Sequence, residues 1–179
     1  MRKSLSFCLF LFINLLCHSQ ELTTGKKVNN IRERIVFVDS LKMDHYMNQN
    51  LFVDGTIKSK KKLFSKQKII GAFFERYTFE NDYIAKLILG HRLFSDSTNT
   101  IRIYIFDSKE DLCYYQELKY YDKDEGMLVY KVEYYLEAAT ILLDEKEGDF
   151  NKNIENHLQK VIGESKRIKS RKKELINYD

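Results

Sequence analysis

The chain has 179 residues, with 30 Lys and Arg against 26 Asp and Glu, and a formal charge of +4. This near balance points to no particular polyanionic partner, and the length suits one domain with a substantial core. Proline and tryptophan are absent, whereas tyrosine and phenylalanine each occur 12 times. Aromatic residues at this density favour β-strands.

The first predicted element is a signal peptide over residues 1–19. Two basic residues, an apolar run and two small residues follow one another: Arg2, Lys3, Phe7–Leu16, Cys17 and Ser19. The apolar run is too short to span a bilayer, and the pattern is typical of a leader cleaved after Ser19. We therefore expect a periplasmic or secreted protein whose mature chain, residues 20–179, is a single domain without a transmembrane helix.

Cysteine usage bears on anchoring and on stability. Cys17 stands where a bacterial lipoprotein carries its lipid, but Leu16 before it is bulky, so a lipid anchor at Cys17 is not expected. Loss of Cys8 and Cys17 with the leader leaves Cys113, and a single thiol forms no internal disulfide. We expect Cys113 to be a small buried side chain on a strand.

The next predicted element is a helix over residues 28–44. Apolar residues recur there at helical spacing: Val28, Ile31, Ile35, Val38 and Leu41. From 46 to 67 the periodicity fades into polar residues and a lysine-rich run over 58–68, which predicts a loop with at most a short strand.

Residues 69–145 are predicted to form an antiparallel sheet. Three stretches share one pattern, in which an aromatic strand ends in an acidic residue and is followed by a polar turn and a returning apolar strand. Their first strands end at Glu80, Asp107 and Glu137. This pattern is typical of β-hairpins. We expect six strands, near 69–79, 83–93, 100–106, 112–121, 127–136 and 139–145.

Helical spacing resumes from Phe150 and predicts a C-terminal helix over 150–175, with a basic end. We expect that end to extend past the core beyond Ser165. The predicted fold class is therefore α+β: an antiparallel β-meander of about six strands covered by an N-terminal and a C-terminal helix. The sheet needs a cover on one face, and we expect both helices to supply it.

The repeated strands also carry a family resemblance. Tyr77-Thr78-Phe79-Glu80 and Tyr104-Ile105-Phe106-Asp107 are each followed by a polar turn and an apolar strand. Residues 71–144 thereby resemble uncharacterised exported proteins of Gram-negative bacteria with repeated Tyr-x-Phe hairpins. The resemblance implies an exported protein with a meander, and it implies no activity or ligand.

No sequence motif predicts a catalytic residue, a cofactor or a metal site. His45, His91 and His157 lack catalytic or metal-binding spacing, and no Gly-x-Ser-x-Gly is present. The acidic clusters at 107–111, 122–125 and 144–149 lack the alternating register of a calcium loop. The lysine run and the basic stretch 166–173 are interpreted as solvated surface, with contact to anionic lipid head groups or lipopolysaccharide as the alternative. Nucleic acid is not an expected partner of an exported protein.

The tyrosines supply the candidate binding face. Five of them lie on the two strands near the centre of the tyrosine-rich stretch: Tyr114, Tyr115, Tyr130, Tyr134 and Tyr135. Alternation along a strand divides them between two faces. If one face is uncovered, its tyrosines would favour a protein, peptide or glycan of the cell envelope. The alternative is that tyrosine simply suits a half-solvated sheet.

Three functions remain open from the sequence. The first is an exported, non-enzymatic binding or scaffolding domain that uses the tyrosine face. The second is an extracytoplasmic hydrolase with dispersed site residues, which requires a pocket with converging titratable groups, such as His91 with an Asp or Glu. The third is an inhibitor or immunity-like protein, which requires an exposed aromatic patch.

Overall fold

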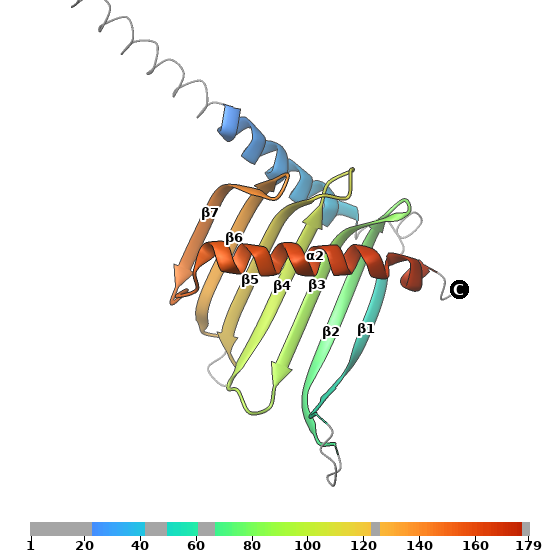
Figure 1. Cartoon of the computed structure of the whole chain (residues 1–179), viewed down its shortest axis with the longest axis vertical. Coiled ribbons are helices and arrows are strands. Elements are labelled where there is room, and N and C mark those ends of the chain that lie inside the picture. Colours follow the sequence, from blue (N-terminus) through green and yellow to red (C-terminus); the bar gives the residue numbers. More distant parts are fainter. Residues whose placement is uncertain (1–22, 42–49, 61–66, 123–125, 177–179) are drawn as a thin grey trace, which may run out of the picture.

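The structure is a computed structural model that describes residues 23–41, 50–60, 67–122 and 126–176. Those residues form a seven-stranded sheet and two helices (Figure 1). The strands are β1 (Asn50–Lys58), β2 (Ile69–Glu80), β3 (Tyr83–Leu93), β4 (Thr98–Phe106), β5 (Leu112–Tyr121), β6 (Leu128–Glu137) and β7 (Thr140–Gly148). The helices are the N-terminal helix (residues 23–40) and α2 (Ile154–Ile176). The predicted leader, residues 1–19, lies outside the described residues.

Every strand pairs antiparallel with its neighbour in sequence, so the sheet order is β1 to β7. This confirms the α+β class and the meander, but the strand count is seven rather than six. The additional strand is β1, within the segment predicted to be mainly a loop. Its side chains alternate between exposed and half-buried along all nine residues, as expected for a strand at the edge of a sheet.

The two helices cover opposite faces of the sheet, so the prediction that both lie on one face is wrong. The α2 face includes Tyr104 and Tyr115, which pack with residues of α2 in one cluster. The other face carries Ile105 and Tyr114, which pack with Val38 and other residues of the N-terminal helix. Because successive strand residues alternate between faces, apolar and aromatic side chains at both parities require a cover on each side.

Helix α2 crosses the middle of the sheet and packs through the stripe that contains Val161 and Ile168 (Figure 1). Ile168 is only 8% exposed, and Arg171 lies 3.2 Å from a carboxylate oxygen of Glu75 on β2. The prediction that the helix leaves the core after Ser165 is therefore wrong, because this later turn still packs on β2. The N-terminal helix begins before the predicted Val28, and residues 42–44 lie outside the described part of the chain.

Candidate functional site

A polar hollow of about 460 Å³ opens on the α2 face. It lies over the ends of β3 to β6 that point away from the N-terminal helix, beside the segment that leads into α2. Side chains that line it and can donate hydrogen bonds include His91, Thr98, Thr100, Arg102, Lys119 and Lys152. Asp96 and Asp149 line it as acceptors, and the amide of Asn151 can both donate and accept. We call this cavity the polar hollow.

Strand register arranges these side chains in two adjacent rows. In one row Thr100 on β4 pairs with His91 on β3 and with Lys119 on β5. In the next row Arg102 on β4 pairs with Glu117 on β5. Because residues two apart on a strand share a face, both rows face the same side as α2.

Glu117, a residue only 1% exposed, also lines the polar hollow. Arg102 donates from Nε to Oε2 at 2.9 Å, and Lys152 donates to Oε1 at 2.5 Å. The hydroxyls of Tyr115 and Tyr130 also donate to this carboxylate. A buried charge is tolerated only when such partners replace its lost hydration. Glu117 is therefore the centre of a buried ion-pair network.

Burial opposes the charge of Glu117, but hydrogen bonds from His157 and Lys152, followed by those from the two tyrosines, outweigh it and hold the pKa well below its ordinary value. His157 lies on α2, with Nε2 3.6 Å from Oε2 of Glu117 and Nδ1 2.8 Å from the hydroxyl of Tyr134. The network thus joins the sheet to α2.

Two basic side chains among those that line the polar hollow, His91 and Lys119, are available to meet a ligand. No hydrogen bond or ion pair joins His91 or Lys119 to any other side chain in the described part of the chain. Burial, followed by the positive charge of Arg102, lowers the pKa of His91, so its imidazole is neutral near pH 7. A neutral imidazole offers one donor and one acceptor, whereas Lys119 offers a charged donor.

The five tyrosines of the predicted binding face are all buried, each no more than 7% exposed. Tyr115, Tyr130 and Tyr134 face α2, and Tyr114 and Tyr135 face the N-terminal helix. The condition for a tyrosine binding face, one uncovered face of the sheet, is therefore not met, because each face of this part of the sheet has its own helix.

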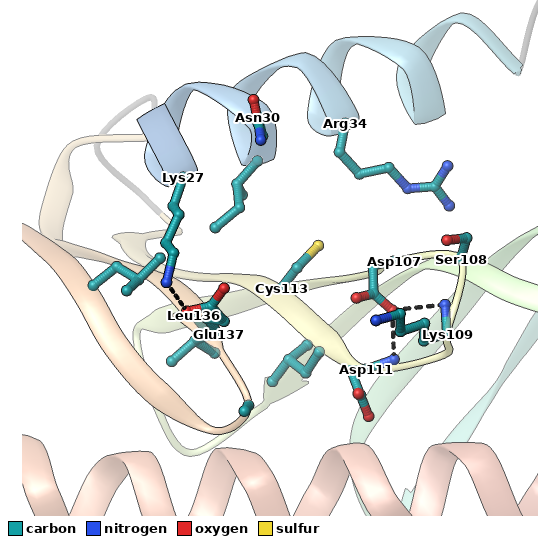
Figure 2. A pocket seen from close by; sticks show the side chains of 14 residues that line it. Lys27, Asn30, Arg34, Asp107, Ser108, Lys109, Asp111, Cys113, Leu136 and Glu137 are labelled. Atoms are coloured by element: carbon teal, nitrogen blue, oxygen red, sulfur yellow. Dashed lines mark hydrogen bonds and ion pairs between the residues drawn. The ribbon is translucent and has the colours of Figure 1, made fainter. Parts of the chain in front are cut away.

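A second hollow, of about 400 Å³, lies between the N-terminal helix and the turns at the ends of β4 and β6. Figure 2 shows Lys27 and Arg34 reaching down from the helix, with α2 on the far side of the sheet. Lys27 pairs with Glu137 at 2.6 Å, and Arg34 donates to the Phe106 carbonyl oxygen at 3.1 Å. These charged groups hold the helix on the sheet, so we interpret this hollow as a structural seam.

Cys113 lies at the floor of that seam (Figure 2). Its side chain is buried on β5, as predicted, and Sγ donates to the carbonyl oxygen of Ile105 at 3.4 Å. Burial, followed by the negative charge of Asp107, raises the pKa of the thiol to about 12. Cys113 is therefore a protonated core side chain.

The three histidines considered as candidates from the sequence lie partly inside and partly outside the described residues. His45 lies outside the described residues, whereas His91 and His157 both approach the Glu117 network. Across the described ranges, no group of three His, Cys, Asp or Glu side chains could hold a metal ion. Within those same ranges, neither helix has the length and apolar character needed to cross a membrane.

Sequence reasoning missed the pair formed by Arg102 and Glu117. Each stands at an inward position in a strand rich in apolar and aromatic residues, and charged residues are rarely buried without a partner. An inward-facing charge of each sign on neighbouring strands was the available signal.

The comparisons with known proteins found no matching family model, curated protein or solved structure. The resemblance to exported proteins with Tyr-x-Phe hairpins therefore stays a prediction.

Proposed function

We propose that this chain is an exported, non-enzymatic binding domain whose ligand site is the polar hollow rather than a tyrosine face. The observation that carries the proposal is the row of His91, Thr100 and Lys119 across three adjacent strands, in a cavity where His91 and Lys119 have no described side-chain partner. Export is supported by the leader-like pattern of residues 1–19.

A glycan is the ligand class that fits this lining best. Donors and acceptors are interspersed, two threonine hydroxyls lie among them, and acidic residues oppose the lysines and Arg102. A polyhydroxylated ligand both donates and accepts hydrogen bonds, so it can use both kinds of group without carrying a large charge. Ligand sites typically combine a preformed concave shape with a few such polar groups.

Calorimetric titration tests the proposal, with soluble neutral and carboxylated oligosaccharides of the cell envelope as probes. Lys119→Ala removes a cation of the hollow that has no partner among the described side chains, and we expect it to weaken binding at least about tenfold, which corresponds to ~1.4 kcal/mol. Lys160→Ala is the matched control, because Lys160 is exposed on α2 and lies outside the hollow. Equal effects of the two substitutions, or no binding of any probe by the native protein, would contradict the proposal.

A second candidate function is an extracytoplasmic hydrolase, favoured by the convergence of His91 with Asp96 and Thr100 in one cavity. A neutral imidazole suits a general base. Binding takes precedence because no hydrogen bond in the described residues orients His91 toward a hydroxyl or a carboxylate, as an activated nucleophile requires. His91→Gln separates the two functions: loss of turnover of ester, peptide or glycoside probes with retained binding would support catalysis.

A further inference from the structure

We propose that β1 is an interface at which a second copy of this chain adds to the sheet by antiparallel strand pairing. The proposal is independent of the polar hollow. Strands β1 and β7 end the sheet order, and the described residues place no further strand beside either one. An edge strand presents unpaired backbone N–H and C=O groups, which form a template for another strand.

The two edges differ in their protection against such pairing. Consecutive charged residues, Asp144, Glu145, Lys146 and Glu147, occupy nearly half of β7. Charged side chains on an edge are a common device against strand addition. In contrast, β1 has the sequence NLFVDGTIK, with Asp54 as its one acidic residue and Lys58 at its end. The sequence therefore discourages pairing at β7 and permits it at β1.

Apolar surface at β1 gives a second copy something to bury. Phe52 is 54% exposed, and its ring stacks on that of Phe74 with centroids 6.3 Å apart. Arg76 lies over the outer ring at 5.9 Å. On the α2 face, Leu51 and Val53 are only partly buried against the core cluster. A strand laid beside β1 would cover apolar side chains on both of its faces.

Charge and strand overlap together select the register of this pairing. Antiparallel self-pairing centred on Gly55 sets Asp54 opposite Thr56 of the second copy and Phe52 opposite Lys58, and it pairs residues 52–58 of both copies. Centring on Thr56 would set Asp54 opposite Lys58, but it would pair only residues 54–58. Centring on Asp54 would instead oppose two like charges, which destabilises a cross-strand pair. The register centred on Gly55 also sets an aromatic ring beside a lysine, a favourable contact. The resulting two-fold arrangement is closed, so it yields a dimer rather than a fibre.

Sedimentation equilibrium of the purified protein over a range of concentrations tests the proposal. We expect a reversible dimer, and we expect Phe52→Lys to raise its dissociation constant at least about tenfold because it adds charge to the edge. Thr56→Asp is a second disrupting variant at an exposed β1 position, because in this register it sets an aspartate opposite Asp54 of the second copy, and circular dichroism checks that both variants remain folded. Met127→Lys is the control, because Met127 is 60% exposed but distant from β1 in the sheet order.

Cysteine cross-linking tests the register. Chains with Asp54→Cys mixed with chains with Thr56→Cys should form a disulfide-linked pair, whereas Asp54→Cys alone should not. The buried Cys113 does not compete for this reaction. A monomer at all concentrations, a dimer unaffected by both β1 variants, or efficient cross-linking of Asp54→Cys with itself would overturn the proposal.

Discussion

Arg102 and Glu117 lie directly opposite each other on β4 and β5, and the guanidinium Nε donates to the carboxylate Oε2 at 2.9 Å. The pair lies where the packed core beneath α2 meets the open polar hollow. On one side the rings of Tyr104 and Tyr115 exclude water, and on the other Lys119 faces the cavity. The same ion pair therefore lies at the boundary of the core and also lines the candidate site.

Glu117→Gln should destabilise the fold by about 3 kcal/mol, because it leaves the charges of Arg102 and Lys152 without their buried counter-ion. Urea denaturation followed by circular dichroism measures the change. Glu147→Gln, an exposed substitution on β7, serves as the control and should stay within about 0.5 kcal/mol of the native protein. If the two variants have the same free energy of unfolding in urea, the Glu117 network does not stabilise the core.

The double variant Arg102→Met with Glu117→Leu should be more stable than Glu117→Gln alone. Replacement of a buried ion pair by apolar residues removes both desolvation costs, whereas removal of one partner leaves an unpaired charge. The same denaturation experiment compares the two. A double variant less stable than the single one would contradict this expectation. It would show that the loss of an acceptor for the other donors, Lys152 and Tyr130 among them, outweighs the gain from removing the buried ion pair.

Stability should fall as the solution is acidified below about pH 5. Burial raises the pKa of Glu117, but the hydrogen bonds from His157, Lys152 and two tyrosines outweigh it, so this pKa is lower in the folded state than its ordinary value of 4.5. Between the folded and the unfolded pKa of Glu117, the unfolded chain therefore binds more protons than the folded chain. The stability that Glu117 contributes above the unfolded pKa is lost as the pH falls toward the folded pKa. Thermal melts from pH 7 to pH 3 should show a shallower decline for Glu117→Gln than for the native protein. Parallel declines would contradict the assignment.

Substitutions in the turn between β6 and β7 should increase the stability of the protein. Ala138 and Ala139 have φ values of 47° and 65°, and they connect the paired residues Glu137 and Thr140. A two-residue turn with both φ values positive strongly prefers Asn-Gly, and the left-handed region costs an ordinary residue roughly 1–2 kcal/mol. Ala138→Asn with Ala139→Gly should therefore stabilise the protein by about 1–2 kcal/mol in urea denaturation.

A matched substitution in the opposite direction checks this explanation. Asn81, in the turn between β2 and β3, has a φ of 52°, and asparagine tolerates that conformation better than alanine does. Asn81→Ala should therefore destabilise the protein. A gain in stability there, or a loss for the Asn-Gly variant, would show that turn strain does not control these two hairpins.

The hairpins were predictable from the sequence because each turn interrupts an alternating strand with polar residues. Strand β1 was harder to recognise, since Asn50, Asp54 and Gly55 are common in loops and its apolar positions are few. Its pairing with β2, rather than its own propensity, makes it a strand. Edge strands in general carry weaker patterns because only one side is paired.

The placement of the helices could not be derived from periodicity. An amphipathic stripe shows that a helix packs, but it does not specify the face of the sheet. The adjacent pairs Tyr114-Tyr115 and Tyr134-Tyr135 held the relevant information, because neighbouring buried rings on a strand imply that both faces are covered. The polar hollow was equally invisible, since His91, Arg102 and Lys119 meet only through the register of three strands.

The meander also determines the order in which the protein can be completed. Each strand pairs with the one made just before it, so the sheet needs only short loop closures and can form progressively from its N-terminal side. The cover for Tyr77, Tyr104 and Tyr134, however, is α2, which follows all seven strands in the sequence. A nascent or prematurely ended chain would thus expose this aromatic cluster until α2 is present, and that interval is when the protein is most vulnerable to aggregation.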